Sequence, residues 1–177
     1  MARVSPLVLL PPVAFAALAG LFLGGMFRDD PDALPSAFVG KPAPEVTATP
    51  FADAPPFDNA TLSEPGVKLV NFFASWCAPC RLEHPFLVEI AAQGVPVYGV
   101  NRDREVAQGL EFLEEMGDPY AGIVFDPDNQ MGIDWGVYGL PETFVIDGEG
   151  TVLLRFAGAL NEPIYRNRIL PAIDAAR

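Results

Sequence analysis

The sequence predicts a mixed α/β domain that follows one apolar N-terminal segment. Three observations support this prediction. Apolar strands alternate with amphipathic helices over residues 41–177, a pair of strands near the end is joined by a Gly-rich turn, and a long apolar run occupies residues 4–27. We therefore expect a membrane anchor or signal peptide over 1–27, a polar linker over 28–40 and one folded domain over 41–177.

The apolar run carries no charged side chain. At about 1.5 Å per residue, a helix of this length can cross a hydrocarbon core of roughly 30 Å. A cleaved signal peptide is the competing interpretation, because residues 17–19 (ALA) form a small-x-small site. The run continues past this site to Phe27, which favours an uncleaved anchor, although Pro11 and Pro12 would kink or shorten the helix. We expect a single-pass membrane protein with its domain outside the cytoplasm, which in a bacterium means an anchor in the inner membrane and a domain in the periplasm.

The composition excludes several classes of protein. With 11 Lys+Arg against 23 Asp+Glu, the net charge is −12, which argues against a nucleic-acid binder. Half of the residues are hydrophobic, as expected for a folded chain. Two cysteines and one histidine exclude a disulfide-rich scaffold and a Cys-only zinc site, but they allow one disulfide.

The domain is expected to begin with a β-α-β unit. Residues 67–73 are almost all apolar and favour β structure, so they predict a strand buried on both faces. Apolar side chains at helical spacing over 81–93 predict a helix that ends at Gly94. Residues 95–101 predict a second buried strand. A unit of this kind is right-handed, with its two strands parallel.

The second half of the domain is expected to hold a helix, a strand, a hairpin and a closing helix that is bent or interrupted at Pro171. In chain order these are a helix over 104–116, a strand over 121–125, hairpin strands over 143–147 and 151–156, and a helix over 162–176.

The two cysteines, Cys77 and Cys80, lie between the first strand and the first helix. A cysteine at the first turn of a helix faces unpaired N–H groups and the positive end of the helix dipole, and both stabilise a thiolate. Cys80 lies one turn further on and can close a disulfide with Cys77, while Pro79 suits the first turn. The pattern predicts a redox-active disulfide, in which one sulfur attacks and the other resolves the mixed disulfide, with no other cofactor.

Other uses of this motif are weaker. A structural disulfide this short would close a small loop and stabilise little. A c-type haem site requires His after the second cysteine, where this chain has Arg81. A metal site would have only three candidate ligands, Cys77, Cys80 and His84. These three side chains still allow copper binding, so a copper chaperone stays a weaker alternative.

The chain resembles the cytochrome c maturation thiol:disulfide interchange proteins, the CcmG/DsbE family. Residues 71–81 (NFFASWCAPCR) are similar to the active-site segment of thioredoxin-like proteins in general. Residues 136–143 (GVYGLPET), with 144–150 and then Ala157-Gly158, are similar to the signature of this particular family. Residues 38–44 (FVGKPAP) resemble the start of its domain.

This resemblance implies a thioredoxin fold with a central strand-helix insertion, which we place within residues 103–140. Pro141 matches the cis-proline that faces the CxxC motif and guides the substrate backbone. The family has an acidic site, and Glu83 and Glu142 are the carboxyl groups expected near the sulfurs, where they disfavour thiolate and accept protons. Trp76 is expected to cover the site.

The resemblance also implies a reductant in c-type cytochrome biogenesis. Haem attachment needs free thiols, which an oxidising compartment converts to a disulfide. The expected partners are apocytochrome c or a thiol protein of the haem-ligation machinery, together with a membrane thiol-electron carrier that supplies electrons. A general periplasmic thiol reductase with another target, a copper chaperone and a dithiol oxidase are the alternatives. Because no cation lies between the cysteines, we expect a reductant rather than a strong oxidant.

Overall fold

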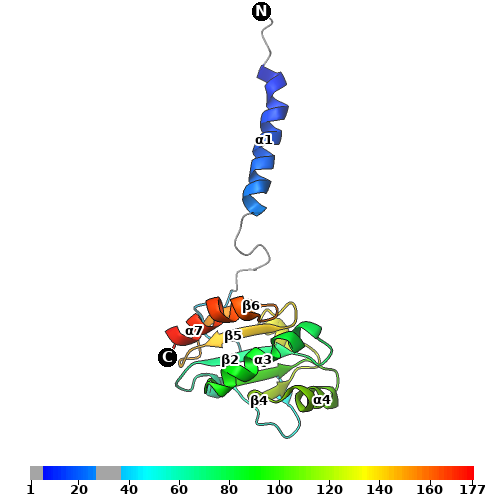
Figure 1. The fold of residues 1–177 in the computed structure, drawn as a ribbon, viewed down its shortest axis with the longest axis vertical. Coiled ribbons are helices and arrows are strands. Elements are labelled where there is room, and N and C mark those ends of the chain that lie inside the picture. Colours follow the sequence, from blue (N-terminus) through cyan, green and yellow to red (C-terminus); the bar gives the residue numbers. More distant parts are fainter. Residues whose placement is uncertain (1–5, 27–36) are drawn as a thin grey trace, which may run out of the picture. The chain divides into compact units, whose positions relative to one another are not determined.

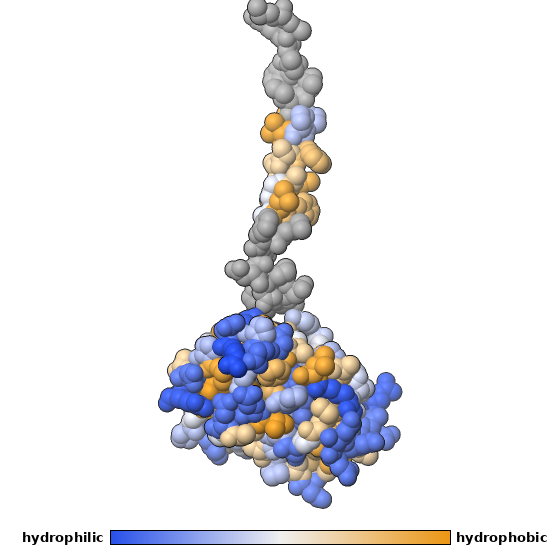
Figure 2. Space-filling model, in the orientation of Figure 1, coloured by the Kyte–Doolittle hydropathy of each residue, from blue (hydrophilic) through white to orange (hydrophobic). Residues whose placement is uncertain are grey.

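The computed structural model describes residues 6–26 and 37–177, which fall into two separate units. The first unit contains helix α1 (Pro6–Met26), with Pro11 and Pro12 inside it and apolar side chains on its surface (Figures 1 and 2). None of the helices in the described ranges combines the length and the hydropathy that a membrane span requires. The predicted anchor over 1–27 therefore gains no support from the structure, and residues 28–36 of the predicted linker lie outside the described residues.

A six-stranded sheet forms the centre of the domain, in the order β1-β4-β3-β2-β5-β6 (Figure 1). Strands β2, β3 and β4 run parallel, while β1, β5 and β6 pair antiparallel with their neighbours, and the predicted β-α-β unit is β2-α3-β3. The strands are β1 (Thr49–Pro50), β2 (Lys68–Phe73), β3 (Val97–Asn101), β4 (Tyr120–Phe125), β5 (Glu142–Ile146) and β6 (Val152–Ala157).

The long helices also follow the sequence pattern, and the closing helix is interrupted as expected. A π-helical turn, η1, precedes the α-helical segment whose first turn holds Pro171, since a proline cannot supply the N–H that a regular helix requires there. The sequence analysis missed β1, α2 and α5, which are short. The helices of the domain are α2 (Asn59–Leu62), α3 (Ala78–Ala92), α4 (Val106–Met116), α5 (Gln130–Asp134), α6 (Glu162–Ile164), η1 (Tyr165–Ile169) and α7 (Leu170–Ala175).

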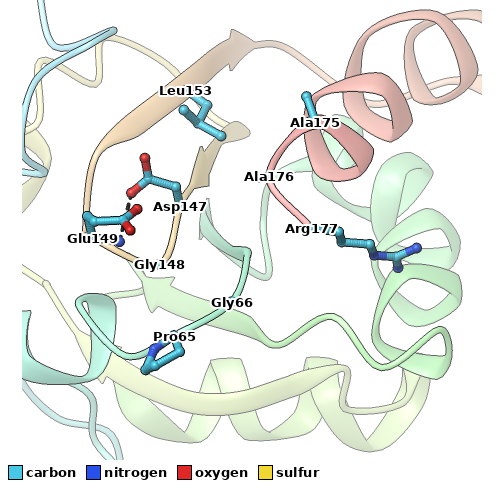
Figure 3. Close-up of a pocket in the computed structure, with 9 residues that line it drawn as sticks. All are labelled: Pro65, Gly66, Asp147, Gly148, Glu149, Leu153, Ala175, Ala176 and Arg177. Atoms are coloured by element: carbon cyan, nitrogen blue, oxygen red, sulfur yellow. Dashed lines mark hydrogen bonds between the residues drawn. The ribbon is translucent and has the colours of Figure 1, made fainter.

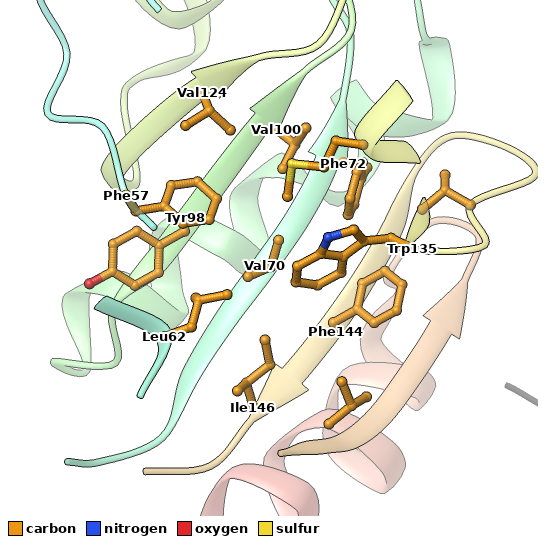
Figure 4. Close-up of a cluster of buried hydrophobic side chains, with 13 residues drawn as sticks. Phe57, Leu62, Val70, Phe72, Tyr98, Val100, Val124, Trp135, Phe144 and Ile146 are labelled. Atoms are coloured by element: carbon orange, nitrogen blue, oxygen red, sulfur yellow. The ribbon is translucent and has the colours of Figure 1, made fainter. Parts of the chain in front are cut away.

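One face of the sheet packs against α2 and α5 through an aromatic core (Figure 4). The Trp135 ring lies 5.6 Å from that of Phe72 and 5.1 Å from that of Phe144, and its Nε1–H donates to the carbonyl of Glu45 at 3.1 Å. This indole is fully buried with its polar atom satisfied, so it fixes α5 to the centre of the sheet.

The other face is covered by α3, α4 and the C-terminal helical segments. Leu87 and Ile90 of α3 pack with Ile169 and Ile173 over the first half of β2. At the other end of β2, a separate cluster joins Phe73 and α4 residues such as Phe112 to Cys77 and Cys80. The cysteines are therefore part of the hydrophobic core on one side.

A surface pocket lies at the opposite end of β2 from the cysteines (Figure 3). It is bounded by Gly66, the hairpin turn 147–149 and the chain end 175–177. Asp147 uses its carboxylate to accept the N–H groups of Glu149 and Thr151, so it stabilises the turn. The pocket is thus separate from the motif that the sequence predicts to be reactive.

The two tryptophans provide a matched test of the core. We expect Trp135→Ala to lower the free energy of unfolding by about 3–5 kcal/mol, because it removes a large buried ring and leaves a cavity. Trp76→Ala should change it by about 0.5 kcal/mol or less, because that side chain is 66% exposed. Urea unfolding followed by circular dichroism measures both, and equal losses for the two variants would contradict this assignment of the core.

Candidate active site

The reactive cysteines lie at the N-terminus of α3, directly after β2. Cys77 is the N-cap residue of α3, and its sulfur accepts the N–H of Cys80 at 3.2 Å. The two sulfurs form a disulfide with a Cα–Cα distance of 5.2 Å. Cys77 is 4% exposed and Cys80 2% exposed, so Cys77 is the more accessible of two largely covered residues. Pro79 lies in the first turn of the helix, as expected.

The loop between β2 and Cys77 is held by residues that the sequence analysis missed. The buried Asp103 carboxylate accepts the Ser75 N–H at 3.0 Å and the Ser75 hydroxyl at 2.8 Å, and Asn101 donates to it at 2.8 Å. The Arg102 N–H also donates to the Phe73 carbonyl at 2.8 Å. The end of β3 therefore fixes the backbone that presents Trp76 and Cys77. The sequence signal that could have indicated these residues is the polar pair Asn101 and Asp103 at the end of an apolar strand.

Pro141 follows a cis peptide bond and lies at the same end of the sheet as the disulfide. The next residue, Glu142, pairs with Phe72 near the end of β2, and Leu140 packs against the cluster that contains both cysteines. The Pro141 carbonyl accepts the N–H of Gly158 at 2.9 Å. Within residues 37–177, Leu140 makes no backbone hydrogen bond of its own, so its backbone is available to another chain.

Glu142 forms an ion pair with Arg155 next to the loop that precedes Pro141. Its carboxylate accepts the Nε–H of Arg155 at 2.7 Å, with side chains 1% and 8% exposed, and it also accepts the Tyr138 N–H at 2.9 Å. Arg155 in turn donates to the Gly136 carbonyl at 2.6 Å and lies over the Tyr138 ring. The pair thus ties both ends of segment 136–142 together and positions the loop before Pro141.

Glu83 is another buried carboxyl group, and the described part of the chain places no cation against it. It lies one turn after Cys80 on α3. Its two oxygens accept the Asn71 amide at 2.7 Å and the Leu160 N–H at 3.1 Å. Burial raises the pKa of this carboxyl to about 8, although the two hydrogen bonds oppose that shift. At neutral pH Glu83 is largely protonated and able to exchange a proton.

Two further sequence candidates occupy different environments. Trp76 is well exposed immediately before Cys77. His84 is buried, its Nε2 lies 2.8 Å from the Gly117 carbonyl, and its ring meets that of Phe112 edge-on at 5.0 Å. Burial lowers the pKa of this imidazole. His84 therefore packs α3 against α4 and against Gly117, the residue that ends α4. The third ligand of the copper-chaperone hypothesis is thus already engaged in packing.

A disulfide at the start of a helix, a cis-proline beside it and a buried acid one turn away define a thioredoxin-fold thiol:disulfide oxidoreductase. The Redoxin family model matches residues 38–169.

Similar proteins of known family show which group of thiol:disulfide oxidoreductases the chain belongs to. The chain is 49% identical over 176 residues to the thiol:disulfide interchange protein DsbE homolog of Paracoccus denitrificans, covering 99% of this chain and 98% of that protein. It is 46% identical to the thiol:disulfide interchange protein HelX of Rhodobacter capsulatus, covering 95% and 96% of the two chains. A DsbE-type crystal structure from Chlorobium tepidum superposes with a TM-score of 0.65 at 28% identity, covering 81% of this chain and 99% of that one. The chain belongs to the DsbE family of thiol:disulfide interchange proteins.

The Glu142–Arg155 pair can be tested by a double-mutant cycle. We expect Arg155→Met to lower the free energy of unfolding by about 3–5 kcal/mol, because it leaves a buried carboxylate without its cation. The further change Glu142→Gln should recover part of this loss, since it removes the charge and keeps an acceptor for the loop N–H groups. Additive losses in urea unfolding would show that the two side chains do not interact.

Glu83 should make stability depend on pH. Its pKa rises from an ordinary 4.5 to about 8 on folding, so the native state binds the proton more tightly than the unfolded state. The resulting stabilisation is complete below pH 4.5 and is lost as the pH rises through about 8. Wild-type stability should therefore fall relative to Glu83→Gln over this window. The exposed Glu114→Gln is the control, and parallel curves for wild type and Glu83→Gln would contradict the assignment.

Proposed function

We propose that this oxidoreductase acts as a reductant in c-type cytochrome maturation. Its substrate would be the disulfide of apocytochrome c or of a thiol protein in the haem-ligation machinery. The observation that carries the proposal is the Cys77–Cys80 disulfide, which lies at the start of α3 without a cation between the cysteines in a chain of the DsbE family. A site of this kind stabilises a reactive thiolate only moderately, as a reductant requires.

The reaction transfers two electrons and begins from the reduced form. The Cys77 thiolate attacks one sulfur of the substrate disulfide, and the other substrate sulfur leaves as a thiolate. The Cys80 thiol loses its proton to the ionised form of Glu83, which is the minor form at neutral pH. The Cys80 sulfur then attacks Cys77. This step forms the Cys77–Cys80 disulfide and releases the second substrate thiolate. A membrane thiol-electron carrier would return two electrons to the protein.

Substrate binding would use the segment before Pro141. Leu140 offers backbone groups with no partner in the described part of the chain, and an extended peptide can pair with such groups as a strand does. The exposed Trp76 and Tyr138 side chains supply apolar surface. The Glu142–Arg155 pair would hold this segment in register with the disulfide, a positioning role that differs from the proton transfer expected from sequence.

The compartment is part of the proposal. A dithiol that reduces an apocytochrome is needed where thiols are otherwise oxidised, which in a bacterium is the periplasm. The apolar run over residues 4–27 would direct the domain there and retain it at the inner membrane. This part of the proposal rests on the sequence of that run.

Trapping the mixed disulfide tests the substrate. In the full chain, Cys80→Ser should accumulate covalent complexes through Cys77, because the second sulfur that would release the substrate is absent. Cys77→Ser is the control and should trap nothing. Mass spectrometry of the captured proteins should find apocytochrome c or a haem-ligation thiol protein. Capture only of other periplasmic proteins would favour a general reductase and overturn the proposed substrate.

A further inference from the structure

A buried chain of hydrogen bonds crosses the sheet from strand β4 to helix α3. The Tyr120 hydroxyl donates to Asn71 Oδ1 at 2.9 Å, and Asn71 Nδ2 donates to Glu83 Oε1 at 2.7 Å. The second hydrogen of the same amide is donated to the Thr143 hydroxyl at 3.0 Å. Side chains from β2, β4, β5 and α3 thus meet around one fully buried asparagine.

The partners of Asn71 define which way its amide points. The phenol donates its only hydrogen to Oδ1, so Oδ1 faces Tyr120 and the NH₂ group faces Glu83 and Thr143. The opposite orientation would point the amide oxygen at Glu83, which places two acceptors together whenever that group is a carboxylate. Tyr120 therefore selects the orientation in which Asn71 is a donor to Glu83.

Tyr120 reaches Asn71 across β3 because the residue between them is Gly99, which pairs with Asn71. A Cβ at Gly99 would lie 3.0 Å from Tyr120 Cδ1 and 3.0 Å from Phe73 Cε1, closer than an ordinary contact. The Tyr120 ring also stacks on Phe73, with centroids 4.8 Å apart and planes at 20°. The missing side chain and this stack fix the ring where its hydroxyl meets the amide.

Few other groups act on Glu83. From α3 itself, Cys80 lies one turn before it, and the neighbouring His84 is engaged by the Gly117 carbonyl. The backbone of Leu160 donates to the second carboxyl oxygen. From β4, Tyr120 is the titratable group that interacts with Glu83, while the Asp118 carboxylate before this strand accepts the Tyr120 N–H.

We propose that Tyr120 and Asn71 are positioning residues for thiol–disulfide exchange, which hold the Glu83 carboxyl group one turn from Cys80 and set the pH at which it accepts a proton. This inference rests on the proposed function, in which Glu83 takes the Cys80 proton. The phenol is supplied by β4, a strand of the central insertion, so the insertion contributes to the redox site as well as to the sheet.

The direction of the effect follows from the hydrogen bonds. The Asn71 donor stabilises the Glu83 carboxylate and so lowers the pKa of that group against the effect of burial. Without the Tyr120 hydroxyl, the amide is free to turn its oxygen toward a protonated Glu83. The protonated acid then gains an acceptor while the carboxylate loses a donor, so deprotonation shifts to higher pH.

The test compares two tyrosine variants in the oxidised full chain. Tyr120→Phe removes the hydroxyl and keeps the ring, while Tyr98→Phe removes the hydroxyl of a buried tyrosine on the other face of the sheet. A ¹³C NMR titration of the glutamate carboxyl groups, with Glu83 assigned by Glu83→Gln, gives the midpoint. We expect about one pH unit of upward shift in Tyr120→Phe and none in Tyr98→Phe.

A second readout separates this inference from the proposed function. The pH profile for reduction of a disulfide-containing Cys-x-x-Cys-His peptide should move upward by the same amount in Tyr120→Phe, and Gly99→Ala should act in the same direction. An unchanged titration in Tyr120→Phe, or an equal shift in Tyr98→Phe, overturns the positioning role while the wild type stays active. A wild type that reduces no peptide at any pH overturns the proposed function instead.

Discussion

The constraint on which the site depends is the abrupt end of β2. Four residues, 74–77, separate the end of the strand from the start of α3. Over these four residues the backbone must leave a buried sheet and place the Cys77 sulfur at the N-terminus of α3. Asp103 makes this possible because it accepts both polar hydrogens of Ser75. The end of β3 thus supplies the partners that a tight connection cannot supply for itself.

Glu142 and Glu83 are both buried, and their surroundings give them different chemistry. Glu142 has a guanidinium and backbone N–H groups as partners, so it organises the loop before Pro141. Glu83 has an amide and one N–H but no cation among the described residues, so burial dominates and raises its pKa. Both residues are glutamates that the sequence analysis placed near the sulfurs, and the Arg155 guanidinium beside Glu142 is the main difference between their surroundings.

The sequence predicted the elements whose signal is local. The apolar runs of β2 and β3, the amphipathic α3 and the CxxC at its start were recognisable because neighbouring residues carry the pattern. The short β1, α2 and α5 form through contacts with the rest of the domain and carry no such pattern. The hydrogen bond from Tyr120 to Asn71 joins residues 49 positions apart, and the pairing of Arg155 with Glu142 depends on the β5-β6 register. The cis bond before Pro141 was predicted through the family resemblance, since few X-Pro bonds are cis.

The raised pKa of Glu83 is compatible with a reactive thiolate at Cys77 in the proposed reaction. A carboxylate near Cys77 would repel the thiolate and oppose its formation. Because burial keeps Glu83 largely neutral at pH 7, its charge would be mostly absent during the proposed attack by Cys77. In the proposed reaction, the ionised fraction of Glu83 accepts the proton of Cys80. Burial without a cation would therefore favour the first step of the proposed exchange, and the ionised fraction of Glu83 would supply the base for the second.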